Sequence, residues 1–115
     1  MINMNKAALI TTTLIICLIT TSALAADLQK SMRRQADSDF RIAEKAYRKA
    51  VKDYGKAFNG LPDSEKTSAC KKINSALYTN RHNMVAEDTF RQQQLKQQIG
   101  KLEQYGSELE CVPKK

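Results

Sequence analysis

The chain has 115 residues, of which 42% are hydrophobic, and its 19 lysines and arginines outnumber its 12 aspartates and glutamates. A chain of this length forms at most one domain. The averages combine two unlike segments, because residues 1–25 hold 16 hydrophobic residues and a single charge. Residues 26–115 carry a net charge of +6, and only 15 of these 90 residues are Leu, Ile, Val or Phe. The second segment is therefore basic and has a thin hydrophobic core.

Residues 1–25 have the three-part pattern of a secretory signal peptide. A short start with one positive charge, Lys6, precedes an apolar run at 7–19, and small residues close the segment at Ala25. The pattern predicts cleavage after Ala25 and a mature domain at 26–115 in the bacterial periplasm. The alternative is an uncleaved anchor in the inner membrane, although a spanning helix needs about 20 largely apolar residues and this run is shorter.

A first helix is predicted from about residue 37. Apolar residues recur there at three- and four-residue intervals, which is typical of an amphipathic helix. They form one stripe: Phe40, Ala43, Tyr47, Ala50, Val51, Tyr54 and Phe58. The polar residues 37–39 offer an N-cap, and Asn59-Gly60 followed by Pro62 predicts the end of the helix. Residues 26–36 either extend this helix or form a flexible arm.

Two further helices are predicted after Pro62. The second begins at about 62–64, and its inner side is formed by Cys70, Ile73, Leu77 and Met84. The third has the most regular apolar stripe of the chain: Leu95, Ile99, Leu102, Tyr105, Leu109 and Val112. Periodicity does not separate these two helices, because residues 69–110 can be drawn as one continuous rod.

Cys70 and Cys111 are the cysteines that remain after residue 25. Two cysteines in a small exported domain predict one disulfide, since the compartment is oxidising. A bond between two chains is the alternative. In one continuous helix the two residues would lie about 60 Å apart, whereas a disulfide needs Cα atoms within about 7 Å. A bond within one chain therefore requires the chain to fold back on itself.

Equal arms place this turn near residue 90, where Thr89 and Gln92 have the spacing of a capping box. A break at residues 80–83 is the rival, but its unequal arms would not bring the two sulfurs together. The predicted fold is therefore all-α: a small three-helix bundle in which one disulfide clips the open end of an antiparallel helical hairpin.

One side of the first predicted helix is strongly basic. Six cationic residues recur along it, and we call them the basic face: Arg41, Lys45, Arg48, Lys49, Lys52 and Lys56. Such a face attracts anionic partners, which in the periplasm means an acidic protein or an anionic envelope component, with a membrane surface as a further option. Nucleic acid is disfavoured because no ladder of aromatic residues is interleaved with the charges. The alternative is an ordinary solvated helix face.

Catalytic chemistry is not supported by the sequence. His82 is the single histidine, and a nucleophile paired with a base needs Ser or Cys beside it. Both cysteines of the mature segment are assigned to the disulfide, and a metal site would need three or four ligands. We expect no enzymatic activity, no metal and no cofactor.

The function that we expect is that of an exported accessory or binding protein, which presents the basic face to an acidic partner at the envelope. A second candidate docking surface is the apolar seam of the third helix, flanked by glutamines at 92–94 and 97–98, although a seam of this spacing more often forms the core. The alternative function is lysis or killing, in which the basic amphipathic segment Asp27–Phe58 leaves the bundle and disturbs anionic membrane.

Overall fold

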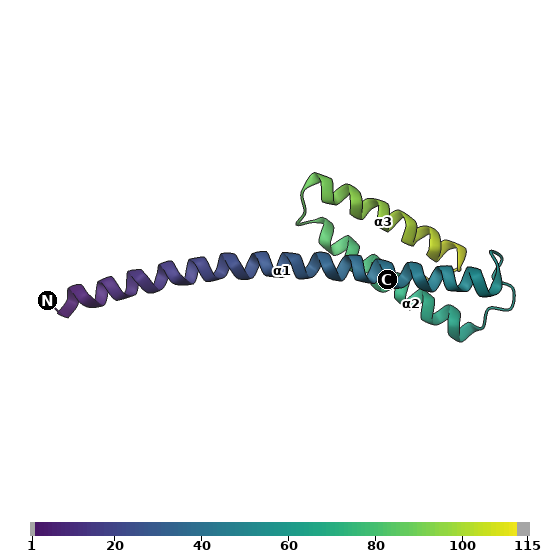
Figure 1. The fold of residues 1–115 in the computed structure, drawn as a ribbon, viewed down its shortest axis with the longest axis horizontal. Helices are drawn as coiled ribbons and strands as arrows, with labels where there is room; N and C mark the ends of the chain where they lie inside the picture. The colour runs from purple at the N-terminus through teal and green to yellow at the C-terminus, as the bar shows by residue number, and fades with distance from the viewer. Residues whose placement is uncertain (1, 113–115) are drawn as a thin grey trace. The chain divides into compact units, whose positions relative to one another are not determined.

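Three helices make up the chain in the computed structural model, which describes residues 2–112 and, from residue 24 onward, their side chains. They are α1 (Ile2–Tyr54), α2 (Asp63–Met84) and α3 (Thr89–Glu108) (Figure 1). No strand occurs in residues 2–112, so the prediction of an all-α fold is confirmed. The chain divides into two compact units, with the boundary between residues 31 and 32.

The first unit contains the predicted signal peptide. The side chains of residues 1–23 lie outside the described residues, and cleavage after Ala25 stays a prediction. Leu24 and Leu28, which follow them, are exposed. Within the part of the chain that the structure describes, no helix combines the length and the apolar character that a membrane crossing requires.

The bounds of α1 differ from the predicted helix at both ends. Residues 26–36 are helical, and the helix continues through 37–39, so none of these three residues is its N-cap. The helix ends at Tyr54, before the predicted stop at Asn59-Gly60, because Gly55 takes a positive φ of 79°. Glycine adopts this left-handed conformation without the steric cost that a Cβ atom imposes, which makes it a common helix terminator.

The core of the second unit is built largely from alanines. Ala43 and Ala50 of α1 pack in one buried cluster with Ala69, Ile73 and Ala76 of α2 and with Leu102 and Leu109 at α3. Alanines seven residues apart lie on the same side of a helix, and both helices carry such a pair. Their small side chains allow α2 to lie within hydrogen-bond reach of the α1 backbone, where Asn80 donates to the Ala36 carbonyl at 3.2 Å. The large members of the predicted α1 stripe, such as Tyr47 and Phe58, are only half-buried and flank this contact.

Most of the predicted α3 stripe is confirmed as core. Leu95 and Leu102 are fully buried, and Leu109, the C-cap residue, is 2% exposed. Val112 is the exception, because α3 ends at Glu108 and Val112 is 82% exposed beyond it. The prediction that Val112 belongs to the stripe was wrong, because it extended the helical spacing beyond the end of α3.

The turn between α2 and α3 lies at residues 85–88, and the rival break at 80–83 falls inside α2. The N-cap of α3 differs from the prediction. Asp88 is the N-cap of α3, and its side chain accepts a hydrogen bond from the backbone N–H of Arg91 at 2.9 Å. Gln92, the second member of the predicted capping box, instead donates to the backbone carbonyls of Met84 and Glu87, both at 3.1 Å. It ties the start of α3 to the end of α2.

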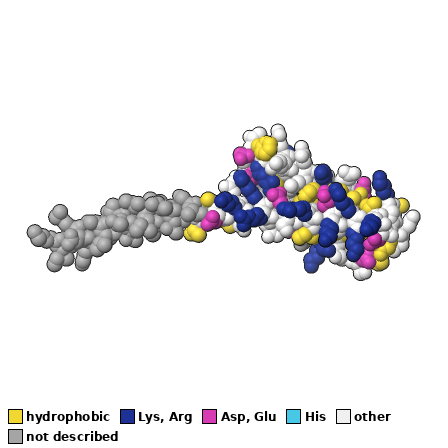
Figure 2. Space-filling view, viewed as in Figure 1, with side chains coloured by type: hydrophobic (Ala, Val, Ile, Leu, Met, Phe, Trp, Pro, Cys, Tyr) yellow, Lys and Arg dark blue, Asp and Glu magenta, His cyan; other side chains and the backbone are white. Residues whose placement is uncertain are grey.

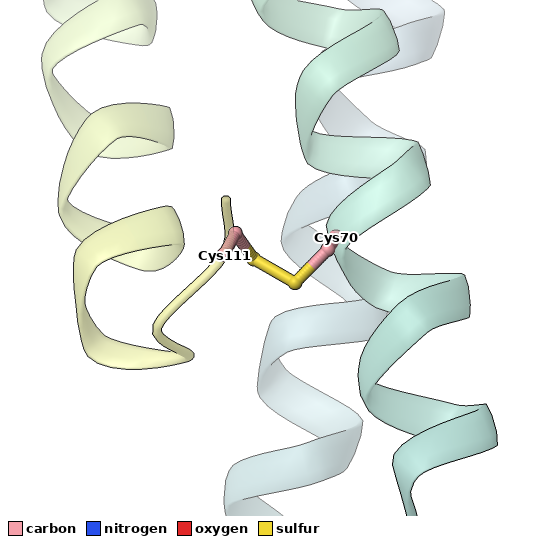
Figure 3. The surroundings of a disulfide bond; sticks show 2 residues. All are labelled: Cys70 and Cys111. Carbon is pink, nitrogen blue, oxygen red and sulfur yellow. A yellow bond between two sulfur atoms is a disulfide. The ribbon is translucent and has the colours of Figure 1, made fainter. Parts of the chain in front are cut away.

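The disulfide between Cys70 and Cys111 is present within the chain, with Cα atoms 5.4 Å apart (Figure 3). Cys70 lies on α2, whereas Cys111 lies just beyond α3. Glu110 has a positive φ of 58°, which turns the chain after α3. The predicted hairpin of α2 and α3, clipped at its open end, is confirmed.

Candidate functional site

All six residues of the basic face have exposed side chains. Five of them belong to α1, and Lys56 lies in the turn that follows it. Figure 2 shows Lys and Arg side chains gathered over this side of the second unit. A helix turns about 100° per residue, so the side opposite the buried Ala43 and Ala50 necessarily faces solvent. Packing of the alanines against α2 therefore determines which way the cations point.

These cations are largely free of counter-charges. Among the described residues, one ion pair involves the basic face: Arg48 lies 3.3 Å from Glu44, one turn earlier in the helix. Arg48 remains 73% exposed in that pair. Surface pairs of this kind contribute little stability, because water screens both charges. The face therefore keeps most of its positive potential.

Two grooves beside α1 add cations that sequence analysis did not associate with the face. The groove between α1 and α2, of about 410 Å³, is lined by Lys71 and Lys72 together with Ile42. The cleft between α1 and α3, of about 530 Å³, is lined by Arg91 and Lys101 together with Arg41 of the basic face. Periodicity within one helix carries no signal for either set, because the rotation of the helices against one another decides which residues meet.

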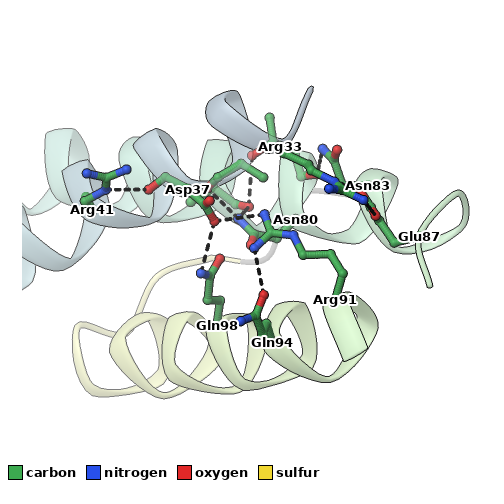
Figure 4. Close-up of polar contacts among 12 residues, drawn as sticks. Arg33, Asp37, Arg41, Asn80, Asn83, Glu87, Arg91, Gln94 and Gln98 are labelled. Carbon is green, nitrogen blue, oxygen red and sulfur yellow. Dashed lines mark hydrogen bonds and ion pairs between the residues drawn. The ribbon is translucent and has the colours of Figure 1, made fainter. Parts of the chain in front are cut away.

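A polar network joins α1 to α3 beside this cleft (Figure 4). Arg91 of α3 donates to Asp37 of α1 at 2.9 Å, and the Gln98 amide donates to the same carboxylate oxygen at 3.2 Å. The Arg91 side chain is only 12% exposed. A second carboxylate, Glu87, receives two hydrogen bonds from the Arg33 guanidinium, at 2.8 and 2.6 Å. These charged contacts align α1 with the α2–α3 hairpin.

Hydrogen bonding to Glu87 raises the pKa of Arg33 above its ordinary value. The Glu87 side chain is 2% exposed, and both of its carboxylate oxygens accept hydrogen bonds from Arg33. A buried carboxylate without a partner carries a large desolvation cost. Arg33 and Glu87 are therefore structural, in contrast to the cations of the basic face.

Two tyrosines border the basic face on the α3 side. The rings of Tyr47 and Tyr105 are stacked with their centroids 4.2 Å apart. The Tyr47 hydroxyl donates to Glu108, and the Tyr105 hydroxyl donates to Glu44 at 3.0 Å. The hydrogen bond to Glu108 raises the pKa of Tyr47 to about 12. Burial, followed by the bond to Glu44, raises the pKa of Tyr105 to about 12.

The apolar seam of α3 is not a free surface, since Leu95, Leu102 and Leu109 are buried in the core. The glutamines that flank the seam have mixed roles. Gln92 and Gln98 make the contacts described above, whereas Gln93 and Gln97 are exposed. The interpretation of the seam as a docking surface for a partner helix is therefore wrong.

His82 lies exposed on α2. Its Nδ1 is 2.9 Å from the backbone carbonyl of Tyr78, one turn earlier, and the two rings are 3.9 Å apart. Within the described residues, no group of three or more His, Cys, Asp or Glu side chains is arranged to hold a metal ion.

Comparisons of the chain with protein-family models, with curated proteins and with solved structures found no match.

Proposed function

We propose that the protein is an exported, non-enzymatic binding module, which presents the basic face of α1 to an acidic protein at the cell envelope. The observation that carries this proposal is the exposure of all six cations, with a single ion pair among them in the described residues. Their spacing is held by a helix packed into a bundle, so docking does not require the face to become ordered first. Such preorganisation reduces the entropic cost of binding.

Export to the periplasm is part of the proposal. The pattern of residues 1–25 supports it, as does the disulfide, because disulfides persist mainly in oxidising compartments. Because the hydrophobic core of this protein is small, the disulfide would contribute a large share of its free energy of unfolding.

Docking is favoured over membrane disruption by the burial of α1. Ala43 and Ala50, on the apolar side of the helix, are in the core. A lytic mechanism would have to separate α1 from the hairpin and break the contacts of Arg91 and Tyr105 with it. A docking surface needs only the side of α1 that is already exposed.

The test measures binding of a fluorescent polyglutamate peptide at increasing salt concentration. Lys49→Gln/Lys52→Gln should weaken binding several-fold and flatten the salt dependence, because charged contacts are screened by ions. The control is Lys66→Gln/Lys96→Gln, which removes the same charge from α2 and α3 outside the basic face. An equal loss of affinity for the peptide in both double variants would refute docking through this face.

A second measurement addresses the lytic alternative. Vesicles that contain anionic phospholipid and an encapsulated dye are mixed with the protein. A docking module should release no dye, and concentration-dependent release would favour membrane disruption instead.

A further inference from the structure

The cleft between α1 and α3 has an uneven charge balance. Three cations line it, Arg41 from α1 and Arg91 and Lys101 from α3, against one carboxylate, Asp37. Its volume is about 530 Å³, which can accommodate a side chain of a partner protein. The cleft opens beside the basic face, since Arg41 belongs to both.

Asp37 does not neutralise the cleft. Its Oδ1 accepts hydrogen bonds from Arg91 at 2.9 Å and from Gln98 at 3.2 Å. This contact balances the charges of Asp37 and Arg91 against each other. Arg41 and Lys101 have no carboxylate within ion-pair distance among the residues that the structure describes. The cleft therefore keeps two uncompensated positive charges.

Hydrogen-bond donors accompany these charges. Arg41 makes one long contact, from Nε to the backbone carbonyl of Asp37 at 3.4 Å, and its terminal nitrogens have no hydrogen-bond partner among the described residues. Gln94 and Gln97 also line the cleft and are exposed. The cleft thus combines uncompensated positive charge with spare donors.

We propose that this cleft is the anchor site for one side-chain carboxylate, Asp or Glu, of the acidic partner. A carboxylate has two oxygens that accept up to about four hydrogen bonds and pair well with guanidinium groups. Arg41 and Lys101 supply the charge, and Gln97 supplies an amide donor. The identity of the occupant rests on the proposed docking function, whereas the basic face outside the cleft supplies long-range attraction.

The arrangement assigns separate roles to the two groups of cations. Lys49 and Lys52 lie on open helix surface, where a charge attracts any anion with little geometric selection. Arg41 and Lys101 line the same cleft from two helices, where one acceptor can contact both. We therefore expect cleft variants to weaken binding of a carboxylate probe selectively, and open-face variants to act mainly through salt-dependent attraction.

The test is an NMR titration of the ¹⁵N-labelled protein with an acetylated, amidated tetraglutamate peptide. The side-chain NH₂ signals of Gln94 and Gln97 should shift and saturate. Lys101→Gln should weaken binding about fivefold, the effect of losing one exposed charged contact. Lys96→Gln removes the same charge from the same helix, outside the cleft, and should leave the affinity unchanged. Unchanged backbone spectra establish that both variants fold.

Several outcomes would overturn this assignment. Equal weakening by Lys96→Gln and Lys101→Gln, or non-saturating shifts spread over all lysines, would exclude a defined site. Saturation of the Gln94 and Gln97 signals by inorganic phosphate, or by nanodiscs of anionic lipid, but not by the peptide would assign the cleft to phosphate groups instead.

The same titration separates the two proposals. If Lys49→Gln/Lys52→Gln abolishes peptide binding while Lys101→Gln has no effect, docking by the basic face stands and the cleft is not its anchor. If the wild-type protein does not bind the peptide at all, both the docking function and the anchor site are refuted.

Discussion

The side chain of Asn80 on α2 donates a hydrogen bond to the backbone carbonyl of Ala36 on α1, with nitrogen and oxygen 3.2 Å apart. Asn80 is completely buried, and the same amide nitrogen also donates to the Ala76 carbonyl of its own helix at 2.8 Å. A short side chain can reach the backbone of the neighbouring helix only where the two helices are close. Residues 36 and 76 are both alanines, which permits this approach.

Replacement of Asn80 by Ala should destabilise the protein by roughly 0.5–1.5 kcal/mol, the net contribution of an intramolecular hydrogen bond, because the buried Asn80 Oδ1 has no hydrogen-bond partner among the described residues to lose. Urea unfolding followed by circular dichroism measures this loss. The matched control is Asn74→Ala on the same helix, where Asn74 is only half-buried. If both variants lose the same free energy of unfolding, the contact between Asn80 and Ala36 does not contribute specifically.

The alanine contact between α1 and α2 predicts intolerance of larger side chains. Ala43 is 0% exposed, so Ala43→Leu must force the helices apart and should cost roughly 1–3 kcal/mol. Gln93→Leu introduces the same side chain at an exposed position of α3 and should cost far less. Thermal unfolding of the two variants decides this, and an Ala43→Leu variant as stable as the wild type would mean that the contact is loose.

The disulfide should contribute about 4 kcal/mol, because it closes a loop over a sequence separation of 41 residues and restricts the unfolded chain. Reduction of the wild-type protein with dithiothreitol should lower its free energy of unfolding by this amount. The Cys70→Ser/Cys111→Ser variant should be equally destabilised and insensitive to reductant. A reductant effect of similar size on the double variant would contradict this assignment.

Alkaline pH should destabilise the fold through two tyrosines. Tyr47 and Tyr105 have pKa values raised from 10.0 to about 12. Between these values the folded state retains phenolic protons that the unfolded state releases, so the free energy of unfolding falls as the pH rises. The stabilisation of the folded state by these two tyrosines is complete below about pH 10 and is lost as the pH passes about 12.

Absorbance at 295 nm detects these ionisations directly. Tyr47→Phe/Tyr105→Phe should remove the two late transitions and weaken the alkaline loss of stability. Tyr78→Phe is the control, because Tyr78 is exposed on α2 and makes no hydrogen bond through its hydroxyl in the described structure. A midpoint near pH 10 for Tyr47 and Tyr105 would show that their bonds to Glu108 and Glu44 do not persist in solution.

The helical class, the disulfide and the hairpin follow from the amino-acid sequence alone. Helical spacing reveals the apolar side of each helix, and the 1.5 Å rise per residue excludes a straight rod when Cys70 must meet Cys111. The basic face followed from the same periodicity. These inferences succeed because they depend on local geometry and on one distance constraint.

Three features are known only from the structure: where α1 ends, how closely α1 and α2 approach, and which cations share a cleft. The predicted helix continued past Gly55 to Asn59-Gly60, because the positive φ of Gly55 does not follow from residue spacing. The presence of Arg41 and Lys101 in one cleft depends on how far each helix is rotated about its own axis. That rotation is set by long-range contacts such as Asn80 with Ala36 and Arg91 with Asp37, which join residues too far apart in the chain for periodicity to relate them.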